Sequence, residues 1–195
     1  DGRDTDVHGF LEYYKMLEEK INEIGIGTIA SVSGRYFAMD RDKNIDRTYK
    51  AYKVMVDLEG NSFNDAYEYV KNQYNTLKDY GFDSSDEFII PAYNKNLKEG
   101  MKNGDSVIFL NFRPDRAIQL STLITNPCFY QDKLVPETIL EDIHYTCMMK
   151  YADSVKGEIA FALPALNNIL GEVLAERNYS QLRIAETEKY AHVTF

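Results

Sequence analysis

The chain has 195 residues, of which 44% are hydrophobic and 27% charged; this suits about one globular domain and excludes a disordered or fibrous chain. Acidic side chains outnumber basic ones by 31 to 22, so the chain lacks the positive surplus that binds nucleic acid or an anionic membrane. The chain has two cysteines, no CxxC spacing, no long apolar run and no basic-then-apolar leader, and we therefore expect a soluble, cytoplasmic protein.

The first half of the chain alternates between helical and strand-like patterns. Apolar residues recur at helical spacing over residues 10–24, and a glycine follows as a stop signal. The β-branched run at residues 28–32 is typical of a buried parallel strand. Helical spacing returns at about residues 44–58 and again at residues 67–77.

The second half continues the same alternation. Residues 106–110 are nearly all apolar and predict a central strand covered on both faces. Pro114 suits the first turn of a helix, which we expect to run through Leu123. Beyond it we expect a strand at residues 143–149, a helix at about 165–176, a strand at 182–184 and finally a short polar helix.

These elements predict an α/β fold of three layers, in which a mostly parallel sheet is flanked by helices. The composition changes near residues 162–164, which read ALP. We therefore expect one domain over residues 1–162, and a linker with the start of a second domain over residues 163–195.

Arginines follow two of the predicted strands directly. Arg35 and Arg41 come after the first strand, and Arg113 and Arg116 come after the strand at residues 106–110. Because ligands of an open parallel sheet bind beyond the carboxyl ends of its strands, we expect both pairs to lie at one edge. Several guanidinium forks together suit a small anion that carries both a phosphate and a carboxylate.

Aspartates beside the same arginines allow a purely structural interpretation. Asp–Arg pairs are common, and each arginine could be held by a carboxylate close to it in sequence. The aspartates concerned are Asp4, Asp40, Asp42, Asp46 and Asp115. The residue pattern alone leaves both interpretations open for each arginine.

Other kinds of site receive little support from the sequence. The three histidines lie far apart without ligand spacing, so we expect no metal site wholly within this chain. The chain contains no GxSxG, Walker A or GxGxxG motif that would nucleate a catalytic serine or a nucleotide pocket. Cys128 and Cys147 stand in apolar company, and we interpret both as inert filler residues.

Long motifs at the two ends of the chain and within it point to a family. The chain reads DGRDT at residues 1–5, IASVSGRY at 29–36 with AMDRD at 38–42, NFRPDRA at 111–117 and LRIAETEKYAHVTF at 182–195. In this order the motifs closely resemble those of the cofactor-independent phosphoglycerate mutases, which belong to the alkaline-phosphatase superfamily.

The resemblance implies an enzyme of two domains. One domain carries a serine nucleophile and two divalent metal ions, usually manganese, and the other positions the glycerate. The resemblance also implies that this chain is most of the inserted, substrate-positioning domain with the start of the metal-bearing domain, and that the serine and the metal ligands lie outside it. Asp1 in place of Met agrees with an excised piece of a longer chain.

The implied reaction is the interconversion of 3-phosphoglycerate and 2-phosphoglycerate through a phosphoserine intermediate, without 2,3-bisphosphoglycerate. It belongs to glycolysis and gluconeogenesis, and we expect the full-length enzyme to be cytoplasmic and monomeric. Because its nucleophile and metals would be missing, we expect this chain to be inactive alone and to need the metal-bearing domain as its partner.

The resemblance assigns substrate contacts residue by residue. The matching positions are Arg3, Asp4, Arg35, Arg41, Arg113, Arg116 and Lys189. Asp4 corresponds to the group that shuttles the hydroxyl proton, and Lys189 to a lysine that reaches the transferring phosphoryl group.

Two other functions stay open. The chain could be a non-catalytic, small-anion binding domain that kept the arginines without a catalytic half. It could also belong to a related phosphomutase that acts on another phosphorylated substrate, although the full set of motifs disfavours this.

Overall fold

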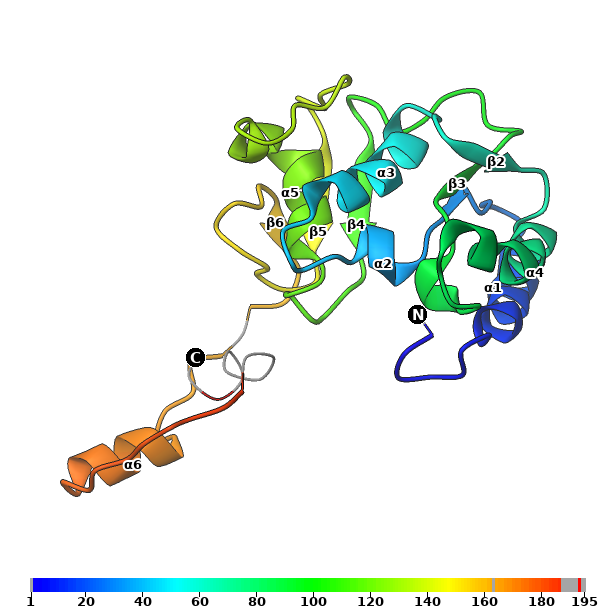
Figure 1. Cartoon of the computed structure of the whole chain (residues 1–195). Coiled ribbons are helices and arrows are strands. Elements are labelled where there is room, and N and C mark those ends of the chain that lie inside the picture. The colour runs from blue at the N-terminus through cyan, green and yellow to red at the C-terminus, as the bar shows by residue number, and fades with distance from the viewer. Residues whose placement is uncertain (1, 163, 187–192, 194–195) are drawn as a thin grey trace. The chain divides into compact units, whose positions relative to one another are not determined.

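The computed structural model describes residues 2–162, 164–186 and 193 of the chain (Figure 1). The chain divides into two compact units, Asp1–Phe161 and Ala162–Phe195. The first unit contains α1 (Phe10–Ile24), β1 (Ser31–Val32), α2 (Arg35–Ala38), α3 (Ile45–Val56), β2 (Asn61–Phe63), α4 (Ala66–Thr76), η1 (Leu77–Tyr80), η2 (Asp86–Phe88), β3 (Ala92–Asn94), β4 (Ser106–Phe109), α5 (Ile118–Thr125), η3 (Pro127–Tyr130), β5 (His144–Cys147) and β6 (Glu158–Ile159). The second unit contains α6 (Leu170–Glu176).

The helices predicted from apolar periodicity are present close to their predicted bounds, as α1, α3 and α4. Hydrogen bonds at their ends help to explain where α1 and α4 begin and where α1 ends. Asp86 accepts a hydrogen bond from the N–H of Phe10 at the start of α1, and α1 ends at Gly25, whose φ of 81° suits glycine. At α4, the side chain of Asp65 accepts hydrogen bonds from the N–H groups of Tyr67 and Glu68.

Some predicted elements differ in bounds or in type. The helix after Pro114 begins only at Ile118, and residues 114–117 before it form a turn in which the N–H of Ala117 donates a hydrogen bond of 2.9 Å to the carbonyl of Pro114. The helix predicted from residue 165 begins at Leu170. The strand predicted at residues 182–184 is absent, because three residues of strand-like pattern form a strand only where another strand pairs with them. The polar helix predicted after it falls largely outside the described residues.

The strands of the first unit form two sheets of three strands each. In the first sheet, with the order β1-β3-β2, β1 pairs antiparallel with β3 and β2 pairs parallel with it. In the second sheet, with the order β4-β5-β6, all pairs are parallel. The α/β class is confirmed, but the two strands that precede the arginine pairs, β1 and β4, lie in different sheets and do not share an edge.

The position of β4 also corrects a prediction. This strand was expected at the centre of a sheet with both faces covered, yet among the described strands it lies at an edge and pairs only with β5. Val107 and Phe109 pack on the core, whereas Ile108 points away from it and is 64% exposed. An apolar run indicates that a strand is suited to burial, but it does not specify what covers each face.

Each sheet packs against its own helices and so builds its own core. Tyr52 of α3 and Leu123 of α5 are fully buried in one core, which also includes Tyr145 and Cys147 of β5 in the second sheet. Val70 of α4 packs on the first sheet in the other core, which also includes Ala92 of β3. Each fully buried aliphatic side chain contributes about 1.5–3 kcal/mol, so the two cores hold the loops between them in place.

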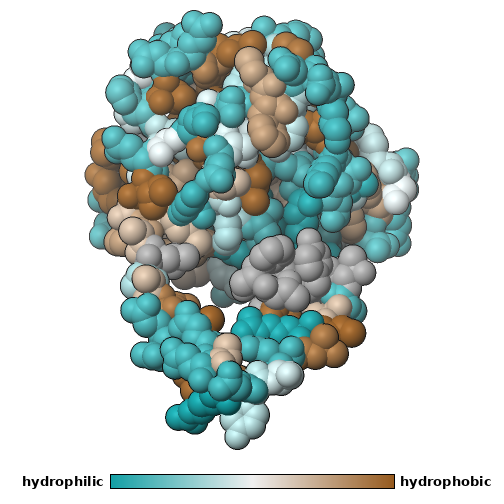
Figure 2. All heavy atoms as spheres, turned by 90° about the vertical axis from the view of Figure 1, so that its left-hand side faces the viewer, coloured by the Kyte–Doolittle hydropathy of each residue, from teal (hydrophilic) through white to brown (hydrophobic). Residues whose placement is uncertain are grey.

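The surface shown in Figure 2 is mostly hydrophilic, with apolar residues in separate patches. In the described part of the chain, no helix is both long enough and apolar enough to cross a membrane. The two cysteines differ in exposure: Cys147 is buried, and burial raises the pKa of its thiol, whereas Cys128 is exposed. The description as an apolar filler therefore fits Cys147 only.

Candidate functional site

Five arginines form a cluster: Arg3, Arg35, Arg41, Arg113 and Arg116. Two of them, Arg3 and Arg35, lie beside the segment around η2, and Gly34 holds Arg35 there. The N–H of Gly34 donates a hydrogen bond of 2.8 Å to the carbonyl of Ile89. A Cβ atom at Gly34 would lie 2.4 Å from the carbonyl oxygen of Glu87 and 2.6 Å from the N–H nitrogen of Ile89. Only glycine permits this close approach, which places Arg35, the first residue of α2, directly beside η2.

Arg3 reaches the same segment through a second glycine. Gly2 has a φ of 72°, and a Cβ atom there would lie 2.7 Å from the Oγ atom of Ser85. From this position the guanidinium of Arg3 lies 3.6 Å from a carboxylate oxygen of Glu87. The two glycines therefore bring arginines from separate motifs onto one short segment of chain.

Arg35 lies at the centre of a group of charges. Its side chain is mostly buried, and burial is the largest cause of the lowered pKa of its guanidinium. The carboxylate of Glu87 acts in the opposite direction, as does that of Asp4. The positive charges of Arg3 and Arg113 lower the pKa further, which indicates that both guanidiniums lie near Arg35.

Asp115 joins the two arginine pairs to one another. One of its carboxylate oxygens lies 2.9 Å from Nη1 of Arg41, and the other lies 2.8 Å from Nε of Arg113. Arg41 comes from the loop between α2 and α3, and Arg113 from the loop after β4. A single carboxylate therefore aligns guanidiniums from two distant motifs.

Arg116 completes the group from the turn before α5. Its Nη1 atom donates a hydrogen bond of 2.8 Å to the carbonyl of Met39. Burial is the largest cause of its lowered pKa, followed by the charges of Arg35 and Arg41, with a smaller effect from Arg3. An arginine has so high a pKa that all these groups keep their positive charge at neutral pH.

The predicted convergence of the arginines therefore occurs, although by a different route. Loops and turns bring them together through Glu87, Asp115 and the carbonyl of Met39, rather than one shared sheet edge. The structural interpretation also holds for Arg113, which pairs with Asp115 two residues away. Arg41 pairs with the same carboxylate, which is 74 residues away in sequence. Lys189, the remaining predicted contact, lies outside the described residues.

Asp40 holds the loop that carries Arg41. It is 3% exposed, and its carboxylate accepts hydrogen bonds from the N–H groups of Asp42 and Asn44. Arg47 of α3 lies 3.4 Å from the other oxygen of Asp40 and stacks on the ring of Tyr36. Asp40 and Arg47 therefore shape the loop that carries Arg41.

Sequence reasoning missed the part played by Glu87 and described Asp115 only as a competing partner. No local pattern marks Glu87, which stands in a different segment from the arginine that it pairs with. For Asp115, the two-residue spacing to Arg113 suggested a pair, but nothing indicated the contact with Arg41.

The arrangement is suited to binding an anion. Among the described residues, five guanidiniums gather close to the carboxylates of Glu87 and Asp115, with that of Asp4 nearby, which concentrates positive charge in this part of an otherwise acidic chain. Each arginine presents donors in a fixed fork that matches a carboxylate or a phosphate. An anion with two charged ends would therefore be held at both ends.

The described residues do not form a metal site. Nowhere among them do three or more His, Cys, Asp or Glu side chains come together in a group that could hold a metal ion. Carboxylates near the arginines are engaged with guanidiniums instead, and they are poorly placed to bind a cation.

The Asp115 clamp predicts a pH dependence of stability. Burial alone would raise the pKa of Asp115, but hydrogen bonds from Arg41 and Arg113 outweigh it and lower the pKa below the ordinary value of 3.8. A lowered pKa stabilises the folded state above the ordinary value, and this contribution is lost as the pH falls through the folded-state value. We expect Asp115→Asn to destabilise the chain by about 1 kcal/mol or less near pH 7.

Thermal unfolding of both chains over a pH series checks this expectation. The difference between them should be constant at neutral pH and shrink as the pH falls below 3.8 and the wild-type carboxyl takes up its proton. Asp79→Asn serves as a control, because Asp79 forms no ion pair within the described residues. A difference that persists in acid would show that Asp115 acts through packing rather than charge.

The sequence matches known proteins over its whole length. Residues 1–153 match the family described as BPG-independent PGAM N-terminus (iPGM_N). The chain is 44% identical over 195 residues to the 2,3-bisphosphoglycerate-independent phosphoglycerate mutase of Staphylococcus aureus (strain N315), and 45% identical to that of Staphylococcus epidermidis (strain ATCC 12228). All of the chain is covered in both cases, but it spans only 37% of the length of these relatives.

A solved structure agrees on the fold. The chain superposes with a TM-score of 0.73 on the phosphoglycerate mutase of Leishmania mexicana, crystallised at low cobalt concentration. The match covers 100% of this chain and 36% of that protein, at 24% identity. At this level of identity the likeness establishes the fold alone.

Proposed function

Because the chain belongs to the family of BPG-independent phosphoglycerate mutases, we propose that it is the substrate-holding part of an enzyme that interconverts 3-phosphoglycerate and 2-phosphoglycerate. In this proposal residues 1–162 position the substrate, and residues 163–195 begin the domain that carries the nucleophilic serine and two divalent metal ions, expected to be manganese. The serine and the metal ligands belong to the remainder of a longer chain. The longer protein acts as a cytoplasmic, monomeric enzyme of glycolysis and gluconeogenesis.

The observation that carries this proposal is the gathering of five arginines from three separate motifs around Glu87 and Asp115. Phosphoglycerate has a carboxylate at one end and a phosphate at the other, and guanidinium forks bind both. A glycerate that must turn between two phosphoryl transfers has to be kept from leaving, and several charge-assisted hydrogen bonds of about 1.5–3 kcal/mol each achieve this.

The residues of this chain have distinct roles in the proposed reaction. Arginines of the cluster hold the carboxylate and steady the transferring phosphoryl group, to which Lys189 also reaches. Asp4 gives a proton to the 3-oxygen as the phosphoryl leaves it, and takes one from the 2-hydroxyl as that oxygen receives the phosphoryl. Its carboxyl group therefore returns to its starting state after each turnover, and no 2,3-bisphosphoglycerate is needed.

A comparison of two proteins tests the proposal. A protein of the relatives' length that contains this sequence should convert 3-phosphoglycerate to 2-phosphoglycerate in the presence of Mn²⁺. The 195-residue chain alone should show no conversion, since positioning without a nucleophile does not transfer a phosphoryl group. Turnover by the chain alone would place the nucleophile within it and contradict the proposal.

Binding without turnover would favour one of the alternatives. If the longer protein binds 3-phosphoglycerate but converts none of it, the arginines serve a small-anion binding domain. If it converts another phosphorylated substrate much faster, the chain belongs to a related phosphomutase.

A further inference from the structure

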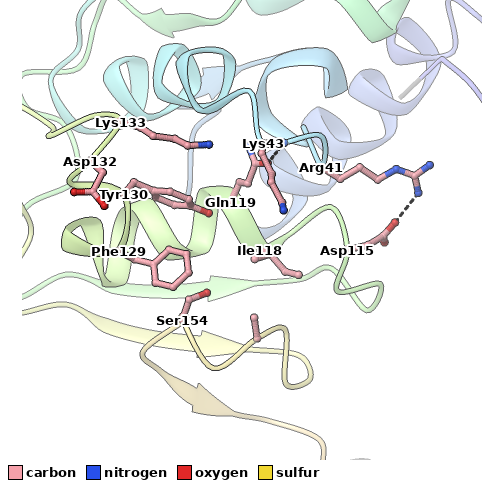
Figure 3. A pocket seen from close by; sticks show the side chains of 11 residues that line it. Arg41, Lys43, Asp115, Ile118, Gln119, Phe129, Tyr130, Asp132, Lys133 and Ser154 are labelled. Atoms are coloured by element: carbon pink, nitrogen blue, oxygen red, sulfur yellow. Dashed lines mark hydrogen bonds and ion pairs between the residues drawn. The ribbon is translucent and has the colours of Figure 1, made fainter. Parts of the chain in front are cut away.

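A cavity of about 490 Å³ lies next to the arginine cluster (Figure 3). Arg41 and Asp115 form one end of the cavity, and the start of α5 and residues of η3 form its walls. This volume is within the range of sites that hold small organic molecules. In the proposed reaction Arg41 and Asp115 belong to the substrate site, but the other residues that line the cavity have no role.

The cavity combines an apolar wall with two ammonium groups. Ile118 and the rings of Phe129 and Tyr130 supply the apolar surface. Lys43 and Lys133 come from distant segments, and Figure 3 shows their ammonium groups reaching toward the space that the hydroxyl of Tyr130 also enters. Within the described residues, neither ammonium group forms an ion pair or a hydrogen bond.

Lys43 is held in place by an unusual backbone conformation. Its φ is 64°, in the left-handed region that a lysine rarely adopts. The N–H of Lys43 donates a hydrogen bond of 2.9 Å to the side chain of Gln119, which is 5% exposed and donates in turn to Thr48. Strain that the surrounding structure maintains in this way is concentrated at functional sites.

The carboxylate of Asp132 determines how an anionic ligand would be oriented in the cavity. Asp132 also lines the cavity, on the far side of Tyr130 from Lys43. The anionic end of a ligand therefore fits nearer to Lys43 and the tip of Lys133, and its apolar body fits over Phe129 and Ile118.

We propose that this cavity binds a small organic anion that joins an aromatic ring to a phosphate or a carboxylate. The anionic group contacts the ammonium groups of Lys43 and Lys133 and the hydroxyl of Tyr130, and the ring packs against Phe129 and Ile118. Phosphoglycerate itself is a poor ligand for this cavity, because it has no apolar body to cover the ring of Phe129. The proposed contacts use none of the residues that the proposed mutase reaction assigns to its substrate.

The test uses phenyl phosphate and inorganic phosphate as probes, titrated into the isotope-labelled 195-residue chain and followed by NMR. We expect phenyl phosphate to shift the amide signals of Lys43, Ile118 and Tyr130 saturably. Inorganic phosphate should bind the same place at least about tenfold more weakly, because it leaves the apolar wall exposed. Equal affinity for the two probes, or shifts confined to Arg113 and Arg116, would overturn the proposal.

Substitutions assign the binding to its residues. Lys43→Gly removes the ammonium group and retains the left-handed backbone without strain, and we expect it to weaken phenyl phosphate binding about tenfold. Phe129→Ala, at a residue that is 61% exposed, should weaken binding without unfolding the chain. Lys98→Ala removes an exposed lysine outside the cavity and should leave the affinity unchanged. Unchanged binding in the first two variants would also overturn the proposal.

Discussion

Arg113→Ala in the longer, active protein is expected to lower kcat/KM for 3-phosphoglycerate by about 10²- to 10³-fold. The side chain of Arg113 is 58% exposed, so its removal should leave the fold intact. The loss follows because a guanidinium fork makes two charge-assisted hydrogen bonds, each worth about 1.5–3 kcal/mol, part of which is spent on its present contact with Asp115. Steady-state kinetics with thermal unfolding on the same samples measure both effects.

Two further variants separate the effect of the guanidinium fork from that of positive charge in general. Arg113→Lys keeps the charge but not the fork, and we expect it to recover only a small part of the lost activity. Lys71→Ala removes an exposed positive charge of α4 that pairs with Glu68 instead, and it should leave kcat/KM unchanged. Full activity in Arg113→Ala would show that this arginine only pairs with Asp115, as the structural interpretation of the sequence allowed.

Gly34→Ala is expected to destabilise the first unit by about 3 kcal/mol or more, and to lower kcat/KM as well. The backbone angles at Gly34 are ordinary for any residue, with a φ of −66° and a ψ of 154°. The cost is steric, because the new Cβ atom would lie 2.4 Å from the carbonyl oxygen of Glu87, and a rigid backbone atom cannot move aside cheaply. The η2 segment must shift, and Arg35 and Arg3 shift with it.

Urea denaturation of the 195-residue chain measures the loss of stability. Gly104→Ala is the matched control, because Gly104 has a φ of 87° but nothing lies within 4 Å of its Cβ position. The control should lose only about 1 kcal/mol, from backbone strain. Equal losses in the two variants would mean that the approach of Gly34 to Glu87 is not a fixed feature of the fold.

The helices could be predicted from the sequence because apolar periodicity is a local property of the chain. The 3.6-residue period of apolar side chains in α1, α3 and α4 reports which face of each helix is buried, whatever lies against that face. Strands carry less of this information. The run that contains β1 and the run that contains β4 look alike, yet one pairs antiparallel and the other parallel, in separate sheets.

The candidate site, too, was predicted from the sequence only in part. The arginines and their neighbouring aspartates were visible in the sequence, because residue type and spacing suffice to mark a guanidinium fork and a possible partner. The contacts made by Glu87, and the cavity beside Lys43, were not visible, since they join segments that only folding brings together.

The linear order of residues was enough to specify the kind of chemistry: an acidic chain with a local group of guanidiniums, in motifs that point to one family. Which carboxylate aligns which arginine, and which sheet holds which strand, depended on the folded chain. The reason is that the free energy of a strand pair or an ion pair depends on both partners, not on one segment or residue alone. Partners separated by 74 residues, as Arg41 and Asp115 are, leave no trace in local periodicity or spacing.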